Sequence, residues 1–265
     1  MRIKKARTGT RLEKAHSNTR YALCGVATGG LLACVTLAPA TWLAKGVERA
    51  TQGYVRLVNP VGTVWNGSAA LVLASGAGGS TALSLPSRMA WQIRPSWSGL
   101  QVALEAACCT PAPVRMHIAA QSLRIASANL HMPLALLQGL GTPWNTLELR
   151  GDVQLQWQPL TVSWSGPGTV LDGVLEVQAR NVSSRLSTLP DVGSYQIRVQ
   201  GGAQPSLDVR TLRGALTLQG QGRWEHSKFR FDGQAHAQPE QATELANLLT
   251  LLGTKRGNTT MIRWG

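Results

Sequence analysis

The feature that most constrains this chain is an alternation of apolar and polar residues that recurs from Tyr54 to Ala237. Successive side chains of an extended strand point to opposite faces, so each alternating run predicts a strand with one buried face. Turn residues such as Gly201 and Gly202 separate the runs. Many short strands at close spacing predict a mainly β domain built on an antiparallel, curved, multi-stranded sheet.

The predicted strands cover most of this region. They are expected at Tyr54–Val58, Ser68–Ala74, Met89–Ile93, Leu100–Ala106, Val114–Ala119, Leu123–Ile125, Leu147–Gln158, Leu160–Trp164, Val170–Val182, Tyr195–Gln200, Leu207–Val209, Leu212–Trp224 and Lys228–Ala237. In the run from residue 212 to residue 224, Leu212, Leu216 and Leu218 are expected to share one face.

Two segments break the period of two and predict short helices. Met132–Gly139 has a proline near its start, a cluster of leucines and a glycine at its end. Glu240–Leu252 follows Pro239, has acidic residues in its early turns and ends before Gly253. Its leucines recur on one helical face, which we expect to cover one end of a sheet. No clear domain boundary is present, although Gly139–Asn145 is the best candidate for a join between two β halves.

A long uncharged run lies near the N-terminus. Tyr21–Ala44 contains 24 residues without a charge. As a helix, such a run would reach roughly 36 Å, which exceeds the hydrocarbon thickness of a bilayer. Tyr21 and Trp42 lie near its ends, as interfacial aromatic residues do. We therefore expect a single transmembrane helix over residues 21–44, which Lys45–Thr51 continues outward.

The charges that flank this run predict its orientation. Residues 1–20 carry seven basic side chains and one acidic side chain. By the positive-inside rule, this basic tail stays in the cytoplasm and the β-rich domain, residues 45–265, lies on the other side. In a bacterium this describes a single-pass inner-membrane protein whose bulk is periplasmic. The alternative is a cleaved signal peptide, since Ala38, Pro39 and Ala40 have the small-x-small pattern of a cleavage site.

The net charge of +13 raises nucleic acid as a possible partner. Its distribution argues against that partner. The first twenty residues alone carry +6, and most basic residues after them are single arginines. We expect no nucleic-acid partner.

The sequence lacks the local motifs of common enzymes. No G-x-S-x-G, H-E-x-x-H or C-x-x-C is present, and no glycine run resembles a phosphate-binding loop. His226 and His236 lie ten residues apart without a third ligand, which is a weak metal signal. Several tryptophans are expected to pack across strands: Trp65, Trp91, Trp97, Trp157, Trp164 and Trp224. We expect no enzyme activity, no catalytic, cofactor-binding or metal-ligating residue, no cofactor and no small-molecule substrate.

Cys108 and Cys109 are adjacent, and the other two cysteines lie within the uncharged run. In an oxidising compartment the pair could form a vicinal disulfide, pair with distant partners or stay reduced. Neighbouring residues of a strand point to opposite faces, so a bond between them requires a turn. Thr110–Pro113 supplies turn-forming residues.

Several segments resemble one family of envelope proteins. Val61–Ala69 is similar to a Gly-Thr-hydrophobic-Trp-x-Gly-x-Ala signature, and Met89–Pro95 is similar to a strand end with tryptophan, apolar residues and proline. Gly220–Trp224 and Phe231–Gly253 resemble a closing strand and a leucine helix, with Gly233–Glu240 at a G-x-A-x-A-x-P-E motif. With a single N-terminal span, these segments resemble the type II secretion system protein N family.

The resemblance implies an accessory inner-membrane subunit of the machine that moves folded periplasmic proteins across the outer membrane. It implies protein contacts with other inner-membrane subunits of that system and carries over no catalytic residue. The family pattern does not account for Cys108 and Cys109. The sheet pattern also resembles the β segments of AsmA-like envelope proteins, which are thought to handle lipid in a groove. Lipid binding in a β-sheet groove is therefore the alternative function.

Overall fold

The computed structural model describes residues 15–164, 168–225 and 228–265. The chain divides into two compact units, Met1–Ala38 and Pro39–Gly265. The described part of the first unit is mainly one helix, α1 (Ala15–Thr36). Most of the predicted basic tail lies outside the described residues.

The predicted transmembrane segment is divided between two helices. Helix α1 ends at Thr36, and α2 (Ala40–Ala50) begins directly after Pro39. Proline lacks an amide hydrogen and disfavours helical backbone at the preceding residue, so a helix is interrupted there. The prediction of one continuous helix over residues 21–44 is therefore wrong in its extent, and α2 belongs to the β-rich unit. No helix in the described part of the chain is long and apolar enough to cross a membrane.

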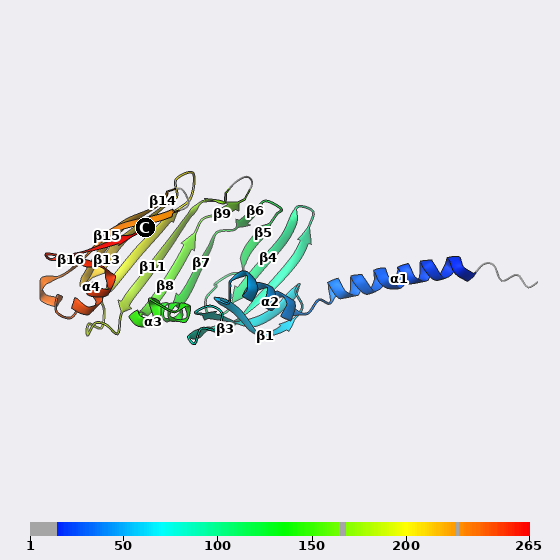
Figure 1. Cartoon of the computed structure of the whole chain (residues 1–265), viewed down its shortest axis with the longest axis horizontal. Coiled ribbons are helices and arrows are strands. Elements are labelled where there is room, and N and C mark those ends of the chain that lie inside the picture. Colours follow the sequence, from blue (N-terminus) through cyan, green and yellow to red (C-terminus); the bar gives the residue numbers. More distant parts are fainter. Residues whose placement is uncertain (1–14, 165–167, 226–227) are drawn as a thin grey trace, which may run out of the picture. The chain divides into compact units, whose positions relative to one another are not determined.

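The mainly β, antiparallel architecture is confirmed (Figure 1). One sheet has the strand order β1-β2-β3-β4-β5-β6-β9-β10, and the other has the order β16-β17-β15-β14-β13-β12-β11-β8-β7. The strands of the first sheet are β1 (Val55–Gly62), β2 (Asn66–Ala74), β3 (Ala82–Ser96), β4 (Gly99–Ala106), β5 (Val114–Ile118), β6 (Ser122–Ile125), β9 (Leu160–Ser163) and β10 (Val170–Asp172). Those of the second are β7 (Ala128–Pro133), β8 (Arg150–Trp157), β11 (Val174–Ser183), β12 (Gly193–Gln200), β13 (Ser206–Gly214), β14 (Leu216–Glu225), β15 (Lys228–Ala237), β16 (Thr254–Arg256) and β17 (Thr259–Trp264).

Three bent segments join the two sheets. Strand β6 leads into β7, β8 into β9 and β10 into β11, and the breaks lie at residues 126–127, 158–159 and 173. Since β6-β9-β10 are neighbours in one sheet and β7-β8-β11 are neighbours in the other, the sheets are two arms of one bent sheet. Gly173 fits the bend with φ +120°, where a Cβ would lie 2.6 Å from Leu160 Cδ2 and 3.0 Å from the Pro159 carbonyl oxygen.

The registers place the chain connections on two opposite rims of the sheet. The hairpin rim holds the tips of β3–β4, β5–β6, β9–β10, β12–β13 and β14–β15, together with the end of β17. The helical rim holds the helices of this unit, which are α2, η1 (Leu134–Leu140), α3 (Trp144–Leu147), η2 (Pro239–Gln241) and α4 (Ala246–Leu252). Figure 1 shows the hairpin tips along the top and the helices along the bottom.

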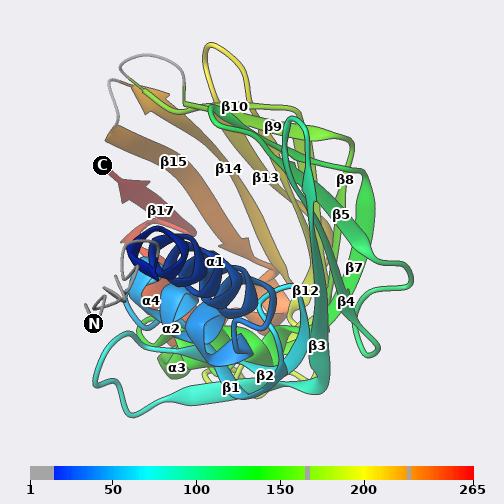
Figure 2. The same ribbon diagram turned by 90° about the vertical axis from the view of Figure 1, so that its right-hand side faces the viewer.

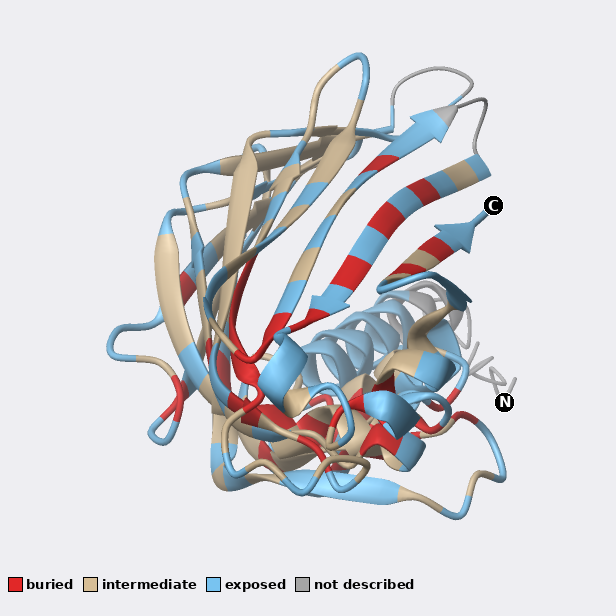
Figure 3. Cartoon of the chain, turned by 90° about the vertical axis from the view of Figure 1, so that its left-hand side faces the viewer, coloured by how far each residue is buried: buried red, intermediate tan, exposed pale blue. Residues whose placement is uncertain are grey.

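The two faces of the bent sheet differ in polarity. Along β15, Phe231, Gly233, Ala235 and Ala237 are buried, whereas the residues between them are exposed (Figure 3). The helices of the helical rim lie on the concave side of the sheet (Figure 2). They pack against the buried side chains, which form the apolar face. The opposite face, with the exposed residues, is the polar face.

Trp91 is the largest fully buried side chain and anchors the first arm of the sheet. Its indole Nε1–H donates to the carbonyl oxygens of Thr63 (3.2 Å) and Val64 (3.1 Å). A Cβ on Gly67 would lie 2.6 Å from the Trp91 ring, so only glycine leaves room for the indole. The segment from Val61 to Ala69, singled out by resemblance, therefore forms the receptacle of this tryptophan.

The second signature has an equivalent role in the other arm. The Phe231 ring lies over Gly220 and Gly233, where an added Cβ would come within 2.4 and 2.7 Å of ring atoms. Ala235 is fully buried, and together with Phe231 it packs against Leu245 beside α4. Small residues alternate with polar residues in β15, so the apolar face of this strand is flat where the segment with α4 packs.

Cys108 and Cys109 form a vicinal disulfide in the turn between β4 and β5. Several hydrogen bonds hold the turn, within it and to neighbouring segments. The Cys108 amide donates to Ser87 Oγ (3.0 Å), the Thr110 hydroxyl donates to the Ala106 carbonyl (3.0 Å), and the His131 amide donates to the Cys109 carbonyl (2.9 Å). Of the three alternatives left open by the sequence, the structure has the bond between neighbours.

The helix predictions hold in position but not in extent. In place of Met132–Gly139, β7 runs to Pro133 and the 3₁₀-helix η1 follows it. In place of Glu240–Leu252, only α4 and the short η2 are helical. The Gly139–Asn145 segment does not join two β halves, because η1 packs against β2, β3 and β8 within one compact unit. Its Gly139 lies so close to β2 that a Cβ would be 2.4 Å from the Leu73 carbonyl oxygen.

Two strand predictions are wrong in extent. The predicted strand Val170–Val182 is divided into β10 and β11 by the bend at Gly173. The run over residues 212–224 is two strands, because β13 ends at Gly214 and β14 begins at Leu216. Gly214 has φ +133° and passes so close to Gly193 that a Cβ would lie 2.2 Å from the Gly193 Cα. Leu212 consequently lies on β13 and is 45% exposed, whereas Leu216 is buried.

We predict that the Trp91 receptacle dominates the stability of the first arm. Trp91→Ala should lower the free energy of unfolding by about 3–5 kcal/mol, because it removes a buried indole and leaves a cavity. Gly67→Ala should lower it by about 1–3 kcal/mol through overpacking against the ring. Chemical denaturation of the full chain measures both, with the fully exposed Trp97→Ala as the control. Equal stability of Trp91→Ala and Trp97→Ala would contradict this account.

The vicinal disulfide is expected to contribute little to stability. A bond between neighbouring residues closes almost no chain, so it removes little entropy from the unfolded state. The double variant Cys108→Ser with Cys109→Ser, and the wild type under a reductant, should each melt within about 3 °C of the oxidised wild type. A larger loss in both samples, or a covalent dimer that disappears in the variant, would show that these cysteines hold more than their own turn.

Candidate interaction surface

Both outer edges of the bent sheet are poorly suited to adding a strand from another protein. On β1, Pro60 lacks an amide hydrogen, and a bulge lies between Val58 and Val61, with Asn59 at φ +50°. On the opposite edge, β16 has only three residues, and Lys255 and Arg256 are exposed there. Proline, bulges, short length and charge are the features that protect edge strands from pairing. The polar face is therefore the better candidate for protein contact.

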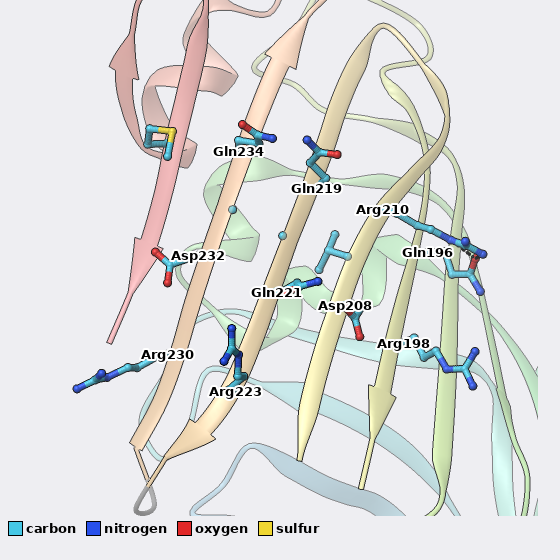
Figure 4. Close-up of a pocket in the computed structure, with 14 residues that line it drawn as sticks. Gln196, Arg198, Asp208, Arg210, Gln219, Gln221, Arg223, Arg230, Asp232 and Gln234 are labelled. Carbon is cyan, nitrogen blue, oxygen red and sulfur yellow. Dashed lines mark hydrogen bonds between the residues drawn. The ribbon is translucent and has the colours of Figure 1, made fainter. Parts of the chain in front are cut away.

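A hollow of about 860 Å³ lies on the polar face between β12 and β17 (Figure 4). Its lining consists mainly of amide and charged side chains, with four arginines and two aspartates: Gln196, Arg198, Asp208, Val209, Arg210, Gln219, Gly220, Gln221, Arg223, Arg230, Asp232, Gly233, Gln234 and Met261. Every second residue of each strand faces outward, so the glutamine and charged side chains of these strands lie together on the polar face. We call this the glutamine hollow.

The charges on one side of the glutamine hollow are held in a network. Gln196 Oε1 accepts two hydrogen bonds from the Arg210 guanidinium, at 2.9 and 2.5 Å. Glu176 accepts from Gln196 Nε2 at 3.4 Å and lies 3.5 Å from Arg198 Nη1. These contacts fix the side chains on β11, β12 and β13, so this side of the hollow is a preformed polar surface.

On its other side, the glutamine hollow places like charges opposite each other. Arg223 of β14 is directly paired in register with Arg230 of β15. Asp232, two residues further along β15, lies 3.4 Å from Arg263 Nε.

A second hollow, of about 780 Å³, lies on the polar face of the other arm. Its lining contains Arg94 of β3, Arg115 of β5 and Arg124 of β6, and no acidic residue. Within the described residues, none of the three arginines forms an ion pair or a side-chain hydrogen bond. The rest of its polar-face lining includes the amide side chains of Gln92 and Gln101 and the small side chain of Ala103. We call this the arginine hollow.

The arginine hollow is assembled by strand register. Arg94 pairs with Gln101, Gln101 with His117, and His117 with Arg124, so these side chains form one row across four strands. In the next row, the small side chain of Ala103 faces Arg115 and leaves space between the rows. His117 Nε2 lies 3.1 Å from Ser98 Oγ. In the sequence, each arginine of this hollow lies at an outward-facing position of an alternating run. Only the strand register shows that these arginines lie close together.

Among the described residues, no group of three or more His, Cys, Asp or Glu side chains is placed to hold a metal ion. His226, one member of the weak metal pair, lies outside the described residues. The other member, His236, donates a hydrogen bond from Nδ1 to the Asn258 carbonyl oxygen at 3.0 Å.

The tryptophan prediction holds for Trp91 and fails for Trp97. Trp157 and Trp164 lie on strands or their ends, and each indole donates to a backbone carbonyl, of Ala126 and Ala120 respectively, at 2.9 Å. Trp97 instead lies at the tip between β3 and β4 and is fully exposed. Its flanking Ser96, Ser98 and Gly99 were the turn signal in the sequence.

Comparison with known proteins agrees with the resemblance. The family model for type II secretion system protein N matches residues 54–263, which is nearly the whole β-rich unit. No curated protein and no solved structure matches the chain. The match includes the Trp91 receptacle and the closing strand with its leucine helix, so its motifs form the core of both arms. The chain belongs to the type II secretion system protein N family, whose role lies in type II secretion.

Proposed function

We propose that the protein is an accessory, single-pass inner-membrane subunit of the type II secretion system that acts by protein contact in the periplasm. The observation that carries the role in secretion is the family match over residues 54–263. The basic N-terminal tail and the uncharged run after it support an anchored protein with a cytoplasmic N-terminus. Its partners are then other inner-membrane subunits of the same system.

The polar face supports contact with an acidic protein surface. The arginine hollow presents three guanidinium groups without acidic neighbours in its lining. Arginine binds carboxylates through two parallel N–H···O bonds, and its guanidinium is more weakly hydrated than an ammonium group. The fold has the rigid sheet that such a binding surface requires.

A second candidate function is lipid binding on the apolar face. The helices cover this face along the helical rim, and apolar side chains continue beyond them toward the hairpin rim. These include Val102, Met116, Ile125, Leu160, Val162, Leu171, Leu155, Val177, Ile197, Leu207 and Leu218. A concave apolar surface of this kind fits acyl chains. We rank it second because no observation ties a lipid to the secretion role.

Charge reversal in the arginine hollow tests the contact mode. The double variant Arg94→Glu with Arg115→Glu should reduce crosslinking to another inner-membrane secretion subunit by about tenfold, because like charges would then face the acidic partner. Crosslinking in intact membranes, followed by mass spectrometry of the adduct, measures this. The double variant Lys255→Glu with Arg256→Glu on the exposed edge strand β16 is the matched control, since it makes the same charge change outside both hollows. Unchanged crosslinking in the double variant would contradict contact between the arginine hollow and an acidic partner.

A photocrosslinking pair distinguishes the two candidate functions. Thr161 and Val162 are neighbours on β9 and face opposite sides of the sheet. With a photoreactive amino acid in place of each, we expect protein adducts from the polar face at position 161 and no lipid adduct from position 162. Abundant phospholipid adducts at position 162, together with no secretion partner at position 161, would reverse our ranking.

Protease protection tests the proposed topology. In spheroplasts, added protease should digest the chain after residue 45, while a tag before Met1 stays protected because the basic tail remains in the cytoplasm. Immunoblotting for the tag measures the protected fragment. A mature N-terminus at Thr41 would instead show a cleaved signal peptide and a protein without an anchor.

A further inference from the structure

Helix α2 has two faces of different chemistry. Ala40 and Ala44 are buried in the core cluster of the first arm. On the opposite face, Trp42, Lys45 and Arg49 recur at spacings of three and four residues, so they lie side by side along the helix. All three are exposed, and Trp42 is exposed to 59%. We call these three residues the outer face of α2.

The two cations of the outer face are not neutralised by neighbouring carboxylates. Among the described residues, no ion pair or side-chain hydrogen bond holds Lys45 or Arg49. Glu48, the only acidic residue of α2, lies on the flank of the helix, 3.5 Å from Arg56 Nε. The outer face therefore combines a net positive charge with an exposed tryptophan.

Covalent connection keeps α2 close to the segment that the proposed function, on which this inference rests, places in the membrane. Helix α2 begins four residues after α1 ends, so the facing ends of the two helices are at most about 14 Å apart. Pro39 lies in this connection and forms a β-bridge with Thr63, at the β1–β2 turn. An anchored α1 consequently holds the start of α2 at the surface of the bilayer that α1 enters.

Two orientations of α2 at that surface differ in how they place the outer face. If α2 continued the direction of a transmembrane helix, Arg49 would lie roughly 10 Å farther from the bilayer than Trp42, at 1.5 Å per residue. If α2 lies along the surface, all three side chains reach the headgroups together. Tryptophan, lysine and arginine are the side chains that favour this interface, and the interruption at Pro39 allows the change of direction. Their recurrence on one face favours the orientation along the surface.

We propose that α2 lies flat on the bilayer that α1 enters, with Trp42 among the headgroups and Lys45 and Arg49 bound to the phosphates of anionic phospholipids. Because the opposite face of α2 packs on β1 and β2, this contact also orients the first arm. The apolar side of β1 and β2, with α2 on it, faces the bilayer. Their polar face is directed away from it, so a protein partner can reach the arginine hollow on that side of the arm.

Photocrosslinking from single positions of the full chain tests the orientation of α2. The chain, with a photoreactive amino acid at position 42, 45 or 49, is reconstituted into vesicles of phosphatidylcholine and phosphatidylglycerol at a 3:1 ratio. We expect lipid adducts, identified by mass spectrometry, at all three positions. Glu105 is the control position, because it is exposed on the polar face of β4 and should give no lipid adduct. Lipid adducts at position 42 without adducts at positions 45 and 49 would overturn the flat orientation.

A charge variant tests the contact with anionic phospholipid. Lys45→Gln with Arg49→Gln should reduce the lipid adducts at position 42 about threefold, because each basic residue near an anionic surface strengthens attachment. Vesicles of phosphatidylcholine alone should reduce the adducts of the wild-type outer face to a similar extent. Lys255→Gln with Arg256→Gln is the matched control, since it removes the same charge from β16 and should change nothing. Equal adducts in both double variants would overturn the proposed lipid contact.

A position within α1 separates failure of this contact from failure of the proposed anchor. Leu31 is exposed and lies in the uncharged run, so a photoreactive amino acid there reports the anchor. Lipid adducts at position 31 without adducts at positions 42, 45 and 49 would overturn the α2 contact alone. Absence of lipid adducts at position 31 would contradict the anchor, and the α2 contact with it.

Photocrosslinking in intact membranes tests whether a protein covers the outer face instead. We expect phospholipid adducts from positions 42, 45 and 49 there as well. Protein adducts in place of lipid adducts at these positions would overturn the proposal. No residue of the outer face lines either hollow, so the crosslinking of the arginine hollow to a secretion subunit is read independently.

Discussion

The line of bends at residues 126–127, 158–159 and 173 is the constraint on which the rest of the molecule depends. Three neighbouring segments cross it and belong to both sheets, so it fixes how the two arms meet. Pro159 interrupts the ladder there, and Gly173 allows the backbones to approach closely. Because the bend is shared by three strands, the concave and convex sides continue from one arm to the other.

Because both sides continue across the bend, one side is apolar and buried in both arms and the other side is polar in both arms. The concave side buries Trp91 in one arm and Phe231 in the other, and the helices cover it along one rim. The convex side is left with amides and arginines, which form the two hollows. In the segments that resemble the family, glycines and alanines make room for Trp91 and Phe231, so these segments form a scaffold. Of the arginines in the arginine hollow, Arg94 lies within the resembling segment Met89–Pro95, whereas Arg115 and Arg124 lie outside the resembling segments.

Much of the fold could be predicted from the sequence, because the period of two directly reports which face of a strand is buried. The antiparallel β architecture and the turn around Cys108 and Cys109 followed from local patterns. The strand break at Gly214 and the helix break at Pro39 did not. In the first case a close backbone approach to Gly193 decides the break, and in the second one proline interrupts an otherwise apolar run. The arginine hollow could not be predicted, since register across four strands brings its residues together.

The order of the strands bears on how the chain reaches this structure. Apart from the pairs β6–β9, β8–β11 and β15–β17, each pairing in the described sheets joins strands that are consecutive along the chain. Pairing of consecutive strands closes short loops, which costs little chain entropy and favours fast folding. Each new strand can add to an edge that its predecessor has already formed. The sheet can therefore grow from its N-terminal arm during synthesis, before the strands that complete the glutamine hollow have emerged.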